Sequence, residues 1–216
     1  MEKLIDYLKR PTYCSNQTPK VIYLLGLFFI YILAIIPISI LIFLVTKEFH
    51  IKHDQLRLST TVNTLLVVIL AGPIYEEIIF RSWLKLKKIN VVLFLITLLF
   101  FIVKSIIDSR VITLVVLTVL MLGFLILLLT YGRITIEKFI SSKFQYFFYT
   151  TAIIFGILHS TNFSGNTYLI LAFMPILGAP QIVLGVILGY VRMKHGLFYS
   201  ILFHMLVNTL LIFTLF

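Results

Sequence analysis

Long apolar stretches alternate with short polar segments along the whole chain. A membrane-spanning helix needs about 20 predominantly apolar residues, within a range of roughly 17–25, and about seven stretches come close to that length. They cover residues 21–45, 59–83, 91–107, 111–131, 144–159, 168–191 and 197–216. Apolar residues do not alternate with a period of two, and the stretches are long, so strands are not expected. The pattern predicts an all-α, polytopic membrane protein of a single domain, residues 1–216.

The sixth stretch is interrupted by Pro175, Gly178 and Pro180. Two interpretations remain open here: a half-helix followed by a full helix, or one kinked helix. Residues 132–143, between the fourth and fifth stretches, read as a polar and mildly amphipathic connection. The GxxxG pattern formed by Gly185 and Gly189 is a weak signal for close helix packing.

Composition supports the membrane interpretation. Hydrophobic residues make up 61% of the chain and charged residues only 12%, against roughly 45–50% and about 25% in an average soluble protein. These values exclude a disordered chain and an ordinary cytosolic enzyme. The single cysteine, Cys14, allows no internal disulfide and no thiol-ligated metal site.

The net charge of +10 indicates membrane-topology signals rather than nucleic-acid binding, because the Lys and Arg residues lie in short segments between the apolar stretches. With the N-terminus in the cytoplasm, 12 of the 18 Lys and Arg residues fall on the inner side and 5 on the outer side. The inner set is Lys3, Lys9, Arg10, Lys20, Lys85, Lys87, Lys88, Arg133, Lys138, Lys143, Arg192 and Lys194. We therefore expect residues 1–20 to be a polar cytoplasmic segment.

Few ionisable residues remain inside the apolar stretches, where such groups are costly and usually functional. Glu76 and Glu77 are adjacent, so their side chains point about 100° apart on a helix. Arg81, four residues after Glu77, lies on its face and is the natural ion-pair partner. Glu76 then needs polar partners from other helices, which His159 and the pair His204 and Asn208 can provide.

Counting from the predicted inner ends at 1.5 Å per residue, Glu76 lies about 18 Å deep, His159 about 21 Å, His204 about 12 Å and Asn208 about 18 Å, which is within roughly two helical turns. A carboxylate in such a site can act as a general base toward water, and imidazole and amide groups can hold the water or stabilise an oxyanion. The residues alone also allow plainer roles. The Glu–Glu–Arg group can be solvated near the headgroups, and His or Asn can join helices by hydrogen bonds.

Taken in order, Glu76-Glu77-x-x-x-Arg81, Phe155-x-x-x-His159 and His204-x-x-x-Asn208 resemble the three motifs of the CPBP family, also called Abi. This is the CAAX-protease and bacteriocin-processing group of intramembrane endopeptidases. The resemblance covers residues 72–211, with a two-helix insertion at about 90–142. Ser82 stands where the family usually has glycine, and the interval between the first two motifs is wider than typical.

The resemblance implies that Glu76 activates water with help from His159, and that His204 and Asn208 stabilise the oxyanion. Glu77 and Arg81 would be supporting residues. There is no HExxH motif, and we expect no cofactor; zinc is not favoured. The expected substrate is a hydrophobic peptide or membrane protein, prenylated or not, in a bacterial cytoplasmic membrane. The alternatives are a non-proteolytic bacteriocin immunity or membrane scaffold protein, and a transporter with a Glu/His proton relay.

Overall fold

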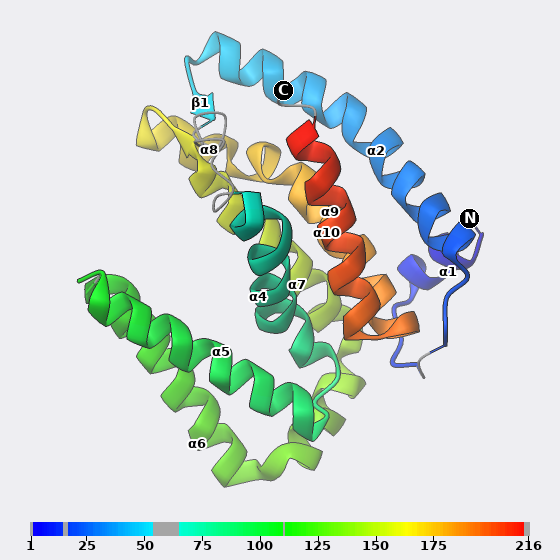
Figure 1. Ribbon diagram of the computed structural model, residues 1–216, viewed down its shortest axis with the longest axis vertical. Helices are drawn as coiled ribbons and strands as arrows, with labels where there is room; N and C mark the ends of the chain where they lie inside the picture. The colour runs from blue at the N-terminus through cyan, green and yellow to red at the C-terminus, as the bar shows by residue number, and fades with distance from the viewer. Residues whose placement is uncertain (1, 15–16, 54–64, 110, 214–216) are drawn as a thin grey trace.

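The computed structural model describes residues 2–14, 17–53, 65–109 and 111–213, and these are mostly helical (Figure 1). The long helices are α1 (Glu2–Lys9), α2 (Val21–Glu48), α4 (Gly72–Arg81), α5 (Lys88–Ile107), α6 (Val111–Ser142), α7 (Phe144–His159), α8 (Thr167–Leu177), α9 (Ala179–His195) and α10 (Leu197–Phe213). The short elements are η2 (Val67–Ala71), η3 (Ser82–Leu84), η4 (Ser160–Asn162), β1 (Lys52–His53) and β2 (Phe163–Ser164). Helices satisfy their own backbone groups, which lipid requires. The predicted all-α class is confirmed.

Four segments within the described residues are long and apolar enough to cross a membrane. They are α2, α5, α6 and the segment Thr167–His195, which contains α8 and α9. In α2 and α6 only 6% of the most apolar window is buried, so their side chains face outward, as lipid-facing helices do. The start of the predicted second stretch, residues 59–64, lies outside the described residues. The span count of about seven therefore stays a prediction.

The interrupted sixth stretch is a half-helix followed by a longer helix. α8 ends at Leu177 and α9 begins at Ala179, with Gly178 between them. The fourth stretch also ends near its predicted boundary, because Gly132 has φ +70° and ψ 154° inside α6. This left-handed φ favours glycine and breaks the helix. Residues 133–142 continue as helix, so the polar and mildly amphipathic connection expected there is helical.

α9 forms the centre of the molecule, with α7, α10 and α2 packed around it (Figure 1). Two of its glycines permit the close approach of α7. A Cβ added to Gly189 would lie 2.8 Å from Phe148 Cε2, and one added to Gly185 would lie 3.1 Å from Ala152 Cα. The close packing predicted from the GxxxG pattern is confirmed.

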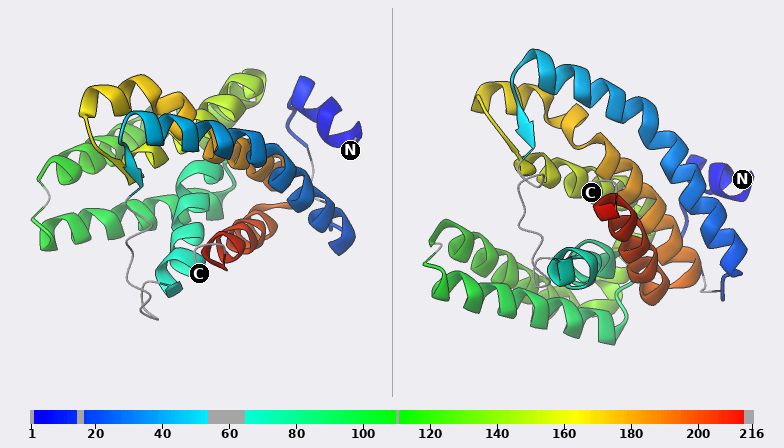
Figure 2. Two further views of the ribbon diagram at one scale, coloured as in Figure 1. Left: turned by 90° about the horizontal axis from the view of Figure 1, so that it is seen from above. Right: turned by 45° about the horizontal axis from the view of Figure 1, so that its top comes forward.

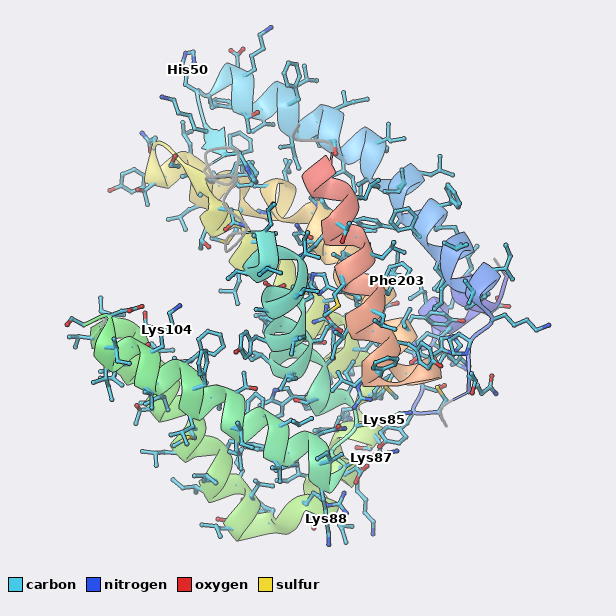
Figure 3. The ribbon with its side chains drawn as sticks, in the orientation of Figure 1. His50, Lys85, Lys87, Lys88, Lys104 and Phe203 are labelled. Carbon is cyan, nitrogen blue, oxygen red and sulfur yellow. The ribbon has the colours of Figure 1, made fainter. Side chains whose placement is uncertain are left out.

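The segments that were predicted to share the inner side contact one another. Lys85 Nζ donates to the Met193 carbonyl at 3.0 Å, and the Gln17 amide donates to the Lys194 carbonyl at 2.6 Å. Figure 3 shows Lys85, Lys87 and Lys88 together at one end of α5, with Lys104 at the other end.

Two segments predicted to lie on the outer side also meet, because β1 pairs with β2 in an antiparallel ladder. The expectation that strands are absent was wrong for these two short elements. Each has two residues, too few for period-2 alternation to appear in the sequence.

The expected two-helix insertion corresponds to α5 and the first part of α6, which pack against each other. Figures 1 and 2 show this pair running side by side along the α4 side of the molecule, away from α2. α4 contacts both α7 and α10, and these two helices pack against α9. The helices α4, α7 and α10 carry the candidate site.

Candidate active site

Three helices bring polar side chains to a single carboxylate oxygen. Glu76 Oε2, on α4, lies 3.5 Å from His204 Nε2 on α10 and 3.8 Å from His159 Nε2 on α7. The three residues are far apart in sequence, and the close packing of their helices joins them. The structure thus brings together the acid and the two imidazoles that the sequence pattern placed at a similar depth.

The three groups differ in their access to the surroundings. The Glu76 side chain is 32% exposed and that of His159 is 19% exposed, whereas that of His204 is only 2% exposed. A cavity of about 730 Å³ lies beside His159, between α2, η4 and the start of α9; its lining includes Ser39, Asn162 and Gln181. His159 therefore borders a space large enough for a ligand, whereas His204 is closed off by the surrounding protein.

The hydrogen bond at the other ring nitrogen of His159 fixes how this residue faces Glu76. Its Nδ1 lies 2.7 Å from the Phe155 carbonyl oxygen. Because a carbonyl only accepts, Nδ1 must carry the hydrogen, and in the neutral ring Nε2 is then an acceptor. A carboxylate and an acceptor nitrogen 3.8 Å apart suit a water molecule that donates one hydrogen to each.

Phe155 also supports both imidazoles through its side chain. Its ring is fully buried and lies 4.5 Å from the His159 ring and 5.7 Å from the His204 ring, between centroids. The Arg81 guanidinium carbon lies 4.7 Å from the same ring centroid. One phenylalanine therefore restrains the rings on α7 and α10 and receives a cation–π contact from α4.

Glu77 forms a second, fully buried carboxylate site beneath His204. Its Oε1 lies 3.9 Å from Arg81 Nε and 3.3 Å from His204 Nδ1, and its Oε2 accepts a hydrogen bond from Ser200 Oγ. The predicted Glu77–Arg81 pair is present, with both side chains 0% exposed. His204 therefore stands between two carboxylates, and Glu77 holds its Nδ1 side.

Arg81 is itself held by α9. Its Nη2 donates to the Gly185 carbonyl at 3.4 Å, and its own carbonyl accepts from Arg192 Nε at 3.1 Å. These bonds fix the end of α4 against the central helix. The charge of the buried guanidinium is offset by the Glu77 carboxylate, since an unpaired buried charge would be very costly.

The sequence analysis missed Ser200. Its hydroxyl donates to Glu77 and lies 3.1 Å from the Leu188 carbonyl, and the residue is fully buried. A signal for it was available, because Ser200, His204 and Asn208 follow one another at intervals of four on α10. Such spacing places all three on one helix face.

Asn208 bonds to the turn that precedes Glu76. Its Nδ2 donates to the Val68 carbonyl at 3.0 Å. In this π-helical turn the Gly72 amide donates to the Val67 carbonyl, and Pro73, five residues after Val68, has no N–H to offer. Asn208 supplies the donor that the proline lacks. Its role as an oxyanion donor stays a prediction.

Within the ranges that the structure describes, no three His, Cys, Asp or Glu side chains are arranged to hold a metal ion.

Residues 133–210 match a protein-family model described as Type II CAAX prenyl endopeptidase Rce1-like. The matched segment contains α7, α8 and α9 and most of α10, and so includes His159, His204 and Asn208. The motif-based resemblance to the CPBP/CAAX protease family is confirmed, and at family level the match supports a CAAX-type intramembrane protease. Together with the apolar helices, it indicates an integral membrane protein. No curated protein and no solved structure matched the chain.

Proposed function

We propose that this protein is an intramembrane endopeptidase that hydrolyses a peptide bond with water activated by Glu76. The observation that carries the proposal is the convergence of His159 and His204 on Glu76 Oε2 from two other helices. The same oxygen is buried and makes no hydrogen bond to the described residues, so it can accept one from a water molecule.

In the proposed reaction, Glu76 takes a proton from the water as the water oxygen attacks the peptide carbonyl carbon. His159 Nε2 accepts the other water hydrogen and orients the nucleophile. The carbonyl electron pair moves to oxygen and forms a tetrahedral oxyanion. Collapse of this intermediate breaks the C–N bond, and the proton held by Glu76 passes to the leaving amine.

The opposite wall of the site stabilises the oxyanion. Glu77 Oε1 lies 3.3 Å from His204 Nδ1 and holds that side of the ring, so that a hydrogen on Nε2, which faces Glu76, can be donated to the developing charge. Asn208 uses one amide hydrogen to hold the Val68 carbonyl, and an amide nitrogen carries a second hydrogen for the oxyanion. In this proposal His159 orients the water on one side of Glu76, and His204 and Asn208 stabilise the oxyanion on the other.

The proposed substrate is a membrane-associated peptide or small membrane protein. The cavity of about 730 Å³ beside His159 lies within the usual range for ligand sites, roughly 300–1,000 Å³. Its lining combines apolar side chains such as Ile42 and Phe163 with polar ones such as Asn162 and Gln181. This combination suits a peptide with apolar side chains and a polar backbone, and it does not require a prenyl group.

The decisive test replaces Glu76 with an isosteric amide. Glu76→Gln should lower the rate of substrate cleavage at least about 100-fold, because the amide cannot take the proton from water. Mass spectrometry of membrane peptides from cells with and without the active protein would identify the cleaved substrate. Glu48→Gln, at the exposed end of α2, is the matched control and should leave cleavage unchanged. Full cleavage by the Glu76→Gln variant would contradict the proposal.

The same assay tests our proposal that the reaction needs no metal. The proton transfers above use only side chains and water, so treatment with a chelator should leave the cleavage rate unchanged. Strong inhibition by the chelator, followed by recovery when zinc is added, would show that the protein is a metalloprotease.

We further propose a bacterial cytoplasmic membrane with the N-terminus inside. The support is the excess of Lys and Arg on the segments joined by the Lys85 and Gln17 contacts. Reporter fusions that are active on only one side of the membrane test the orientation. A reporter after residue 20 should be active in the cytoplasm, and one after residue 53 outside; the reverse pattern would overturn the orientation.

A further inference from the structure

A second cavity lies at the opposite end of α2 from β1, away from Glu76. It has a volume of about 800 Å³ and is enclosed by the N-terminal segment, the start of α2 and the end of α9. We propose that this cavity binds the phosphate-bearing headgroup of an anionic phospholipid. The inference does not depend on the proposed protease activity.

The charge of the lining favours an anion. Arg10, Lys20 and Lys194 line the cavity, together with one acid, Asp6. Asp6 lies 3.8 Å from Lys9, which offsets its charge. Cations placed at a membrane interface attract anionic lipid headgroups.

The backbone adds to this positive potential. α2 begins beside the cavity, and its first turn has no acidic residue and no side-chain cap at Lys20. The first N–H groups of a helix lack partners within the helix, and the N-terminus carries a partial positive charge. A phosphate at this position would accept from those groups.

One wall offers a polar atom whose hydrogen-bonding capacity the described residues do not use. His195 Nδ1 donates to the Gln17 carbonyl at 2.7 Å, which leaves Nε2 as an acceptor in the neutral ring. This Nε2 is buried and has no partner among the residues that the structure describes. A hydroxyl of a glycerol headgroup could donate to it.

The apolar surface beside the cavity distinguishes a lipid from a free anion. Val21 and Ile22 are each 73% exposed and Leu25 is 39% exposed, directly after Lys20. Ile22 also lines the cavity. A headgroup bound here would have its acyl chains against the first turns of a helix that is long enough to span the membrane. Free phosphate would gain nothing from that surface.

The test is native mass spectrometry of the full chain in detergent, titrated with phosphatidylglycerol or with phosphatidylcholine carrying the same acyl chains. We expect tighter binding of phosphatidylglycerol. Changing both Arg10→Gln and Lys20→Gln should weaken that binding roughly fivefold for each cation removed. Both side chains are exposed, so the fold should be retained.

The matched control, Lys47→Gln with Lys138→Gln, removes the same charge at exposed positions elsewhere and should leave binding unchanged. Inorganic phosphate in excess should not displace the lipid. Equal binding of the two lipids, an equal loss in the control, or displacement by phosphate would each overturn the proposal, the last by showing a site for a free anion.

Discussion

At the scale of single residues, two adjacent glutamates occupy opposite environments. Glu76 is 32% exposed and faces two imidazoles, whereas Glu77 is fully buried and faces Arg81. This division could be predicted, because helix geometry separates neighbouring side chains and places residue i+4 on the face of residue i. The Ser200 bond to Glu77 spans 123 positions. It depends on how α10 packs, which local spacing does not specify.

The buried Glu77–Arg81 pair predicts a strong and reciprocal effect on stability. Arg81→Met would leave Glu77 buried without its cation, and the free energy of unfolding should fall by about 3–5 kcal/mol. Adding Glu77→Gln to this variant should restore a large part of the loss, because the unpaired charge is removed. Denaturant unfolding in detergent micelles measures both changes.

The control for this pair is Lys9→Met, which removes a partner from the Asp6–Lys9 pair, where both side chains are more than 70% exposed. Its effect should stay within about 1 kcal/mol. A double variant no more stable than Arg81→Met alone would show that the pair is not what stabilises this part of α4.

At the scale of helices, the lengths of apolar stretches predict most boundaries well. α7 occupies the predicted range, and the break before α9 coincides with Gly178. For the residues after Gly132 the pattern predicted only a polar, mildly amphipathic connection, and the structure shows that this connection is helical. Several of those residues, including Arg133, Glu137 and Lys138, are in fact good helix formers. The apolar pattern could not predict the π-helical turn η2, because this turn depends on Pro73 and on the hydrogen bond from Asn208 of α10 to the Val68 carbonyl.

The contact between α7 and α9 can be tested through glycine. Gly189→Ala places a Cβ 2.8 Å from Phe148 Cε2, a fully packed ring, so the helices must move apart or the ring must shift. The free energy of unfolding should fall by about 1–3 kcal/mol. Gly123→Ala in α6 has no heavy atom within 4 Å of the added Cβ. Because alanine has a higher helix propensity than glycine, Gly123→Ala should leave the free energy of unfolding unchanged or raise it slightly. Equal effects would argue against close packing at Gly189.

At the scale of the whole molecule, contacts at the two ends of the helices agree with the alternation of inner and outer segments. The N-terminal segment, the loop after α4 and the end of α9 meet at one end, and β1 and β2 meet at the other. The charge pattern predicted which segments share a side. It could not predict the individual bonds, because each joins loops that are more than 100 residues apart.

The contact between Lys85 and the end of α9 is sensitive to pH. Burial lowers its pKa from 10.5 to about 8. Between these values the unfolded chain holds a proton that the folded chain has released, so the free energy of unfolding should rise as pH increases from about 8 to about 10.5. Lys85→Met should remove this contribution, and the exposed Lys87→Met should keep it. The measurement is denaturant unfolding of both variants across this pH range. The same dependence of the free energy of unfolding on pH in the two variants would contradict the assignment to Lys85.

The position of α10 in the chain has a consequence for synthesis. A ribosome makes α4 and α7 first, so Glu76 and His159 are present before His204, Ser200 and Asn208 have been translated. Until then Glu77 lacks its hydroxyl donor, and the Val68 carbonyl lacks the amide that holds it. The growing polypeptide therefore carries Glu76 without the contacts from α10, so under the proposed mechanism it becomes able to hydrolyse a peptide bond only after its last described helix has been made and packed.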